Sequence, residues 1–272
     1  MPQLHRLGVW VEVRAVRGST PREAGAWMSV GLSGLLAGTV GGGHLEFDAI
    51  AKAQAFLSEL QKSSSVDPLP PFEHTYKLGP HLGQCCGGEV LLQFTPMPEN
   101  ELQQRVQQRL QNDKIPVTLF GAGHIGHALI AMGQRLPIHW WWIDSRDGVF
   151  PSGLESSVVC EHSTPVHDAV GDAVQGRHVL IMSFSHAEDF DILERILQKM
   201  SDGMKPLSIG LIGSATKWSS FKSRLMRKGY SEEQLAQVRC PVGLAGLRSK
   251  EPSVVALSVL AELFALNPLS GH

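Results

Sequence analysis

The sequence predicts an α/β protein with two domains, in which a smaller mixed α/β domain precedes a Rossmann-like, doubly wound parallel sheet. The length of 272 residues suits two domains of ordinary size. The second half alternates short apolar strands with helices, which is typical of a parallel sheet. A G-x-G-x-x-G turn joins the first of those strands to its helix. We therefore expect one domain over residues 1–98, a helical connector over 99–113 and the Rossmann-like domain over 114–272.

The composition indicates an ordinary globular protein. Hydrophobic residues make up 43% of the chain and charged residues 18%, which excludes a disordered or highly charged chain. The 24 Lys and Arg residues nearly balance the 26 Asp and Glu residues, so a globally basic nucleic-acid binder is not expected. Four cysteines without a C-x-x-C pair predict neither a disulfide framework nor a structural zinc site. Since no signal peptide or membrane-spanning run is visible, we expect a cytoplasmic protein that binds neither membrane nor nucleic acid.

The first domain is expected to begin with a strand and to end at two prolines. Residues 8–16 alternate apolar and polar side chains toward their end, which predicts a strand. The apolar spacing of 46–60 predicts a helix, and the serine- and proline-rich stretch 61–71 predicts a surface loop. Further strands are expected at 28–30, 35–40, 74–78 and 89–94. Glycine-rich loops are expected at 18–25, 41–43 and 82–88.

A polar helix over 99–112 is expected to connect this domain to the second one. In the second domain, strands are expected at 116–120, 138–143, 179–184 and 207–212. Helices are expected after Gly126 to about Arg135 and at 190–200, 218–228 and 252–266. The last helix starts at Pro252, a residue type favoured in a first helical turn. Its leucines suit either an interface with a second copy or a contact with the domain's own sheet.

The G-x-G-x-x-G motif is the clearest ligand signal in the second domain. Gly121 permits a tight turn, Gly123 lets the backbone approach a phosphate, and Gly126 allows the helix to pack closely on the sheet. Asp144 ends the next strand, where an acidic residue holds ribose hydroxyls in a dinucleotide site. The alternative is a Rossmann-type domain that no longer binds a dinucleotide.

Several charged residues beside these turns are further candidates. His124 would contact an anion or face solvent, and Arg146 would meet a phosphate or a surface carboxylate. In a second glycine-containing turn, Ser214, the helix amides and Lys217 predict an oxyanion pocket. The basic residues farther along that helix are better interpreted as a solvated face.

The first domain carries two unusual loops. Cys85 and Cys86 stand between glycines, where two thiolates suit a soft metal or a sulfur-containing ligand. The alternative is one buried inert thiol and one exposed thiol. In the other loop, the amides of the glycines before His44 can converge on an anion. Glu46 then caps the helix or accepts from a ligand, and Arg22 adds a cation.

These motifs, taken together, resemble the XdhC/CoxI family over nearly the whole chain and in the expected order. The first domain contributes GSTPR at 18–22, GGGHLE at 41–46 and LGQCCGG at 82–88. The second domain contributes FGAGHIG at 120–126, WIDSR at 142–146, GLIGSATKW at 210–218, CPVGL at 240–244 and SKEP at 249–252. One departure is Phe184, which stands where the family commonly has a histidine, while His186 and Asp189 still fit.

The resemblance implies a non-catalytic accessory protein, a chaperone of xanthine dehydrogenase maturation. Such proteins bind molybdenum cofactor (molybdopterin), protect it while its terminal sulfur is installed, and help insert it into apo-xanthine dehydrogenase. The implied partners are a cysteine desulfurase, the molybdenum subunit of the dehydrogenase and a second copy of the chain. The runner-up is an NAD(P)-dependent oxidoreductase that uses the G-x-G-x-x-G domain, and a third possibility is an adaptor that only docks two partners.

On this interpretation Cys85 and Cys86 would face molybdenum or its dithiolene. The glycine turns and Lys217 would hold the phosphate. Glu46 or Asp144 would meet the pterin ring. No catalytic residue is expected. The complete set of expected cofactor-binding residues is Arg22, Gly42, Gly43, His44, Glu46, Gln84, Cys85, Cys86, Gly121, Gly123, His124, Gly126, Asp144, Arg146, Ser214 and Lys217.

Overall fold

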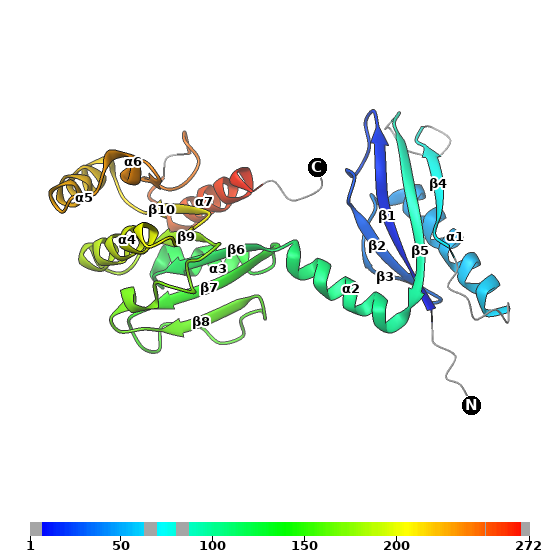
Figure 1. Cartoon of the computed structure of the whole chain (residues 1–272), viewed down its shortest axis with the longest axis horizontal. Coiled ribbons are helices and arrows are strands. Elements are labelled where there is room, and N and C mark those ends of the chain that lie inside the picture. The colour runs from blue at the N-terminus through cyan, green and yellow to red at the C-terminus, as the bar shows by residue number, and fades with distance from the viewer. Residues whose placement is uncertain (1–6, 63–69, 80–86, 248, 268–272) are drawn as a thin grey trace. The chain divides into compact units, whose positions relative to one another are not determined.

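The structure is a computed structural model that describes residues 7–62, 70–79, 87–247 and 249–267. The chain divides into two compact units, with the boundary between Asp113 and Lys114 (Figure 1). The first unit is built on an antiparallel sheet and the second on a parallel one. This confirms the predicted fold class.

The first unit holds a five-stranded antiparallel sheet with the strand order β3-β2-β1-β5-β4. Its strands are β1 (Leu7–Arg17), β2 (Trp27–Gly31), β3 (Gly34–Gly38), β4 (Phe72–Lys77) and β5 (Glu89–Pro98). Its helices are α1 (Gly43–Lys62) and α2 (Glu99–Asn112).

Helices α1 and α2 pack on opposite faces of this sheet. Successive side chains of a strand point to opposite faces, so Val9 and Val11 share the core cluster that includes Leu45 of α1, whereas Trp10 faces the other way. Trp10 stacks on Trp27 with ring centroids 4.6 Å apart, and Leu102 of α2 packs against this pair. The polar helix that was expected to be a connector therefore also covers one face of the first sheet.

The second unit holds a six-stranded parallel sheet with the strand order β11-β10-β9-β6-β7-β8. Its strands are β6 (Ile115–Phe120), β7 (Ile138–Asp144), β8 (Val158–His162), β9 (His178–Ile181), β10 (Ser208–Leu211) and β11 (Val238–Arg239). Its helices are α3 (His124–Gly133), the 3-10 helix η2 (Val166–Ala169), α4 (His186–Ser201), α5 (Ala215–Arg227), α6 (Glu232–Leu235) and α7 (Pro252–Leu266).

The order of the strands predicts where a binding crevice would lie. The chain runs outward from β6 to β8, returns beside β6 as β9, and then continues to β11 on the other side. In doubly wound sheets, ligands bind outside the carboxyl ends of the strands at such a reversal. The G-x-G-x-x-G turn follows β6, so it lies at this edge.

The apolar tail helix packs within the second unit. Leu260 and Leu263 of α7 are buried in the core cluster that includes Leu129 of α3, while Leu257 is 53% exposed. None of the helices in the described part of the chain has the length and apolar character needed to span a bilayer.

Candidate functional site

Three glycine-bearing loops meet in the first unit, formed by residues 18–25, 41–43 and 87–88. A Cβ atom on Gly41 would lie 2.6 Å from Cγ of Pro21, and Gly41 has a positive φ of 133°. A Cβ atom on Gly88 would collide with the backbone of Arg17 and Ser19. Glycine is therefore required at both positions, because the loops approach each other more closely than side chains allow.

The carboxylate of Glu46 stabilises the glycine run from inside the unit. Its Oε2 accepts hydrogen bonds from the Thr39 hydroxyl at 2.5 Å, the Val40 amide at 3.0 Å and the Gly42 amide at 3.3 Å. The sequence predicted that the glycine amides converge on an anion; in the structure the Gly42 amide donates to Glu46, whereas the Gly41 amide donates to the Thr39 hydroxyl at 3.2 Å. Two other candidates, Arg22 and His44, have exposed side chains.

The candidates Gln84, Cys85 and Cys86 lie outside the described residues. The described residues on either side of them come together, because the Leu78 amide donates to the Gly88 carbonyl at 2.8 Å. In the sequence, Cys86 is two residues before Gly88.

The three glycines of the G-x-G-x-x-G turn differ in what surrounds them. Gly121 has a φ of 119°, and a Cβ atom on it would collide with the backbone of Met182. A Cβ atom on Gly126 would collide with the Gly121 carbonyl. Gly123 is different, because no atom lies within 4 Å of the corresponding position. Gly121 and Gly126 are thus required by packing, and Gly123 borders free space at the carboxyl edge of the sheet.

We expect Gly123→Val and Gly126→Val to separate binding from folding. Gly123→Val should melt within a few degrees of the wild type, since its side chain enters free space. It should nevertheless weaken ligand binding about ten-fold or more, because the side chain blocks the approach of a phosphate to the backbone. Gly126→Val should unfold the second unit, because its side chain has no room against Gly121. Melting curves and a titration with nucleotide or pterin check both outcomes. Unchanged binding by a folded Gly123→Val protein would show that this turn does not hold the ligand.

Both oxygens of the Asp144 carboxylate accept hydrogen bonds, from Arg146 in the same loop and from Ala122 in the turn after β6. Its Oδ1 accepts from the amide and Nε of Arg146 at 2.8 and 2.9 Å. Its Oδ2 accepts from the Ala122 amide at 2.5 Å and from Nη2 of Arg146 at 2.9 Å. Burial favours the neutral acid, but these hydrogen bonds outweigh it and lower the pKa of Asp144 below its ordinary value of 3.8. The carboxylate therefore stays ionised and connects the turn after β6 to the end of β7.

The lowered pKa of Asp144 predicts a pH-dependent contribution to stability. A carboxyl group with a lower pKa in the folded state stabilises the protein above its unfolded pKa, and it loses this contribution as the pH falls through the folded value. The free energy of unfolding of the wild type should exceed that of Asp144→Asn by a constant amount above about pH 5, and the difference should shrink below about pH 4. Urea unfolding at several pH values measures this difference. Asp147→Asn, at an exposed carboxylate nearby, is the matched control. A difference that does not change with pH would contradict the assignment.

Lys217 forms a buried ion pair. Its Nζ lies 2.5 Å from Oδ2 of Asp189 and 2.7 Å from the Ile212 carbonyl, and the two side chains are only 7% and 2% exposed. Oδ1 of Asp189 accepts from the amide and the hydroxyl of Ser183, each at 2.7 Å. The other candidate of this turn, Ser214, caps α5 by accepting from the Lys217 amide at 3.3 Å. Lys217 thus connects the loop after β10 to α4, and Ser214 caps α5.

His124, Arg146 and Phe184 have exposed or partly exposed side chains near the carboxyl ends of the strands. His124 begins α3 and is exposed, and the Arg146 side chain is 39% exposed. The guanidinium carbon of Arg146 lies 5.3 Å from the ring centroid of Phe184, which is 58% exposed. The hydrogen bond to Asp144, followed by the charges of Asp144 and Glu188, raises the pKa of Arg146. Sequence reasoning noted Phe184 only as a departure from a family pattern and missed its contact with Arg146.

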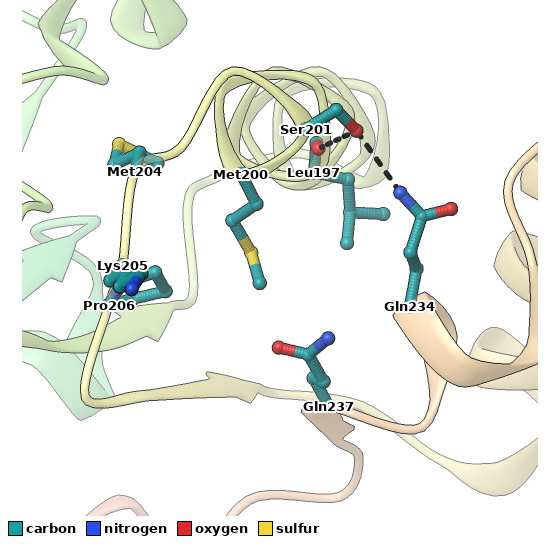
Figure 2. A pocket seen from close by; sticks show the side chains of 8 residues that line it. All are labelled: Leu197, Met200, Ser201, Met204, Lys205, Pro206, Gln234 and Gln237. Carbon is teal, nitrogen blue, oxygen red and sulfur yellow. Dashed lines mark hydrogen bonds between the residues drawn. The ribbon is translucent and has the colours of Figure 1, made fainter.

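A separate pocket of about 410 Å3 lies at the other end of the parallel strands. Residues before β10 and β11 line it together with the end of α4, so it opens at the amino ends of these strands (Figure 2). Met200 and Leu197 lie opposite Gln234 and Gln237 in this pocket (Figure 2). It contains none of the residues that the sequence predicted.

Within the residues that the structure describes, no group of three or more His, Cys, Asp or Glu side chains could hold a metal ion. The cysteine pair at 85–86 lies outside those residues, so its suitability as a metal ligand stays a prediction.

Comparison with known proteins gives two further findings. A curated relative from Escherichia coli (strain K12), the uncharacterized protein YqeB, is 25% identical over 256 residues. The match covers 91% of this chain but 41% of YqeB, so the chain spans about two fifths of that relative's length. A crystal structure described as a xanthine dehydrogenase from Bacillus halodurans superposes with a TM-score of 0.75 at 19% identity. The superposition covers 97% of this chain and 92% of the Bacillus halodurans chain. The two chains therefore share a fold.

Family models match both units. Residues 5–66 match the model described as the XdhC and CoxI family. Residues 117–263, more than half of the chain, match the model of the XdhC Rossmann domain. The chain therefore belongs to the XdhC and CoxI family.

Proposed function

We propose that this protein is an accessory factor, a chaperone that binds molybdenum cofactor, protects it while its terminal sulfur is installed, and helps insert it into apo-xanthine dehydrogenase. One observation carries the proposal most directly: the three family loops of the first unit meet through Gly41 and Gly88, and the sequence places Cys85 and Cys86 immediately before one of them. Membership of the XdhC and CoxI family supports the same role.

The residues present suit the chemistry of this cofactor, which combines a pterin, a dithiolene, a soft metal and a phosphate. Thiolates are preferred ligands of soft metals, so the cysteine pair suits the metal side. Exposed cations suit a phosphate, and the first unit offers Arg22 while the second offers Arg146. Gly123 borders free space where a backbone can approach an anion.

In this proposal the chain binds molybdenum cofactor and protects it from solvent, and it catalyses no step itself. Cys85 and Cys86 would hold the metal side of the cofactor, and the glycine loops would enclose it and exclude water and oxygen. Glu46 and Asp144 act through their own loops, because their oxygens already accept hydrogen bonds from backbone amides beside the glycines. When bound, the cofactor supplies the redox chemistry that the mature dehydrogenase uses.

The remaining parts of the proposal concern location and partners. We expect a cytoplasmic homodimer that contacts the molybdenum subunit of apo-xanthine dehydrogenase and a cysteine desulfurase. We expect it to bind neither nucleic acid nor membranes, in keeping with its net charge of -2. Leu257, exposed on α7, is available to such contacts.

An NAD(P)-dependent oxidoreductase is the second candidate, favoured by the open position beside Gly123 in the dinucleotide-like turn. The engaged carboxylate of Asp144 weighs against the NAD form of this candidate, because both of its oxygens are used within the protein. Hydride transfer from NADH or NADPH to an acceptor, absent in the carrier proposal, would favour the oxidoreductase.

Delivery is tested by reconstitution of apo-xanthine dehydrogenase under anaerobic conditions. Equal amounts of sulfurated molybdenum cofactor are supplied either free or preloaded on this protein, and dehydrogenase activity is followed with time. The preloaded cofactor should activate more enzyme, because it is protected before insertion. Serum albumin at the same concentration controls for non-specific protection. Equal activation with this protein and with albumin would contradict the proposal.

A further inference from the structure

The paired side chains of Asp144 and Arg146 restrict what the crevice of the second unit can bind. In an NAD site, the acidic residue at the end of this strand accepts hydrogen bonds from ribose hydroxyls. A carboxylate offers about four lone-pair positions. In this chain Ala122 and Arg146 donate four hydrogen bonds to Asp144, and the Asp144 side chain is 1% exposed. A ribose would have to displace a bidentate charged pair to reach this carboxylate.

Arg146 is held in place by the same pair. Its Nε and Nη2 bind the carboxylate, and the guanidinium carries three further N–H donors. The side chain is 39% exposed and lies against the exposed ring of Phe184. Glu188, the other carboxylate that acts on Arg146, accepts a hydrogen bond from the Ser145 hydroxyl at 2.5 Å. The crevice thus presents a fixed guanidinium and a flat apolar ring.

We infer that Arg146 is a specificity-determining residue that selects ligands carrying a phosphate monoester over ligands with a free ribose diol. A planar guanidinium binds phosphate through paired hydrogen bonds. An adjacent aromatic ring suits the flat heterocycle, adenine or pterin, of a molecule that carries such a phosphate. This inference deepens the proposed function, because the phosphate of molybdenum cofactor is one source of this chemistry and the 2′-phosphate of NADPH is the other.

The pair NADPH and NADH, which differ by one phosphate, tests the inference. Fluorescence titration of the full chain should give NADPH binding about ten-fold or more tighter than NADH. In Arg146→Ala this preference should disappear, and NADH should bind more tightly than to the wild type because Asp144 is released. Arg135→Ala removes an arginine that is 85% exposed and should leave the preference unchanged. Binding of neither nucleotide, equal binding of both, or a preference that survives in Arg146→Ala would overturn the inference.

A second variant keeps the test decisive if Arg146→Ala does not fold. Arg146→Lys retains the charge but loses the planar fork, so its preference for NADPH should fall below that of the wild type. An unchanged preference in a folded Arg146→Lys protein would also overturn the inference.

The source of the phosphate is identified by competition. Displacement of bound NADPH by molybdenum cofactor assigns the site to the pterin phosphate, and failure to displace it assigns the site to a nucleotide; both outcomes support phosphate selection. Molybdenum retention by the wild type is measured separately. The proposed function can therefore fail while phosphate selection holds, and the reverse can also occur.

Discussion

Replacement of Lys217 by methionine should lower the free energy of unfolding of the second unit by about 3–5 kcal/mol, the cost of leaving a buried charge without its partner. The side chain of Asp189 is 2% exposed and faces Nζ of Lys217 at 2.5 Å. Methionine fills a similar volume, so the loss of charge dominates the loss of packing. Ser183 still donates two hydrogen bonds to Asp189 in the variant, which places the expected loss toward the lower end of that range.

Lys222 of the same helix provides the matched control. It also forms an ion pair at 2.5 Å, with Glu232, but the two side chains are 36% and 65% exposed. Lys222→Met should therefore change the free energy of unfolding by about 1 kcal/mol or less. Urea unfolding of the two variants, followed by circular dichroism, measures both values. Similar losses in the two variants would show that burial of the Lys217–Asp189 pair does not control its contribution.

Replacement of Cys85 or Cys86 by alanine should lower retention of molybdenum cofactor about ten-fold or more in at least one case, because a soft metal loses a thiolate ligand. The melting temperature should stay close to that of the wild type. A purely structural cysteine gives the opposite pattern, with a loss of stability and little direct effect on binding. Anaerobic gel filtration with metal analysis, together with a melting curve, distinguishes the two patterns.

Cys160→Ala is the matched control for the cysteine pair, because Cys160 is a free and exposed cysteine of β8. It should change neither retention nor stability. If the single variants and the double variant at positions 85 and 86 retain molybdenum as well as the wild type, the pair is not the ligand site. The glycine loops would then have to account for binding alone.

The spacing of apolar residues and the positions of proline and glycine were sufficient to predict most of the fold. The apolar tail with proline at its start was expected as a helix over 252–266, and α7 spans Pro252–Leu266. The strand expected over 89–94 is longer in the structure, because β5 continues through Pro96 to Pro98. The pairing of β4 with β5 stops at Phe94, so beyond this point β5 has β1 as its partner and proline is tolerated on the freed side.

Short edge elements could not be predicted, because tertiary contacts define them. Strand β11 has two residues, and the four residues of α6 are too few for a helical period. Strand β8 forms the outer edge of its sheet and has no fully buried side chain. Likewise, α2 is polar except for a few positions. Its buried residue Leu102 packs against Trp10 and Trp27, which lie far away in the sequence, so this contact could not be predicted.

The position of Asp144 was predictable from the sequence, but its hydrogen bonds were not. Strand ends and glycine spacing place Asp144 beside the turn at Gly121, as the structure has it. The sequence gives no sign that Arg146 turns back onto Asp144, nor that Lys217 reaches Asp189 across 28 positions. Such pairs depend on how α4, α5 and the strand ends are arranged in three dimensions. As a result, charged residues that look available to a ligand in the sequence are bound to each other in the fold.

Retention of molybdenum by the wild-type chain tests the central claim most directly. The purified 272-residue chain is mixed anaerobically with molybdenum cofactor, separated by gel filtration and analysed for molybdenum. The carrier account predicts molybdenum in the protein fractions at a ratio that saturates as cofactor is added, with loss of retention in the Cys85→Ala/Cys86→Ala protein. Elution of the molybdenum with the small molecules, at cofactor concentrations up to those of the protein and above, would contradict the account.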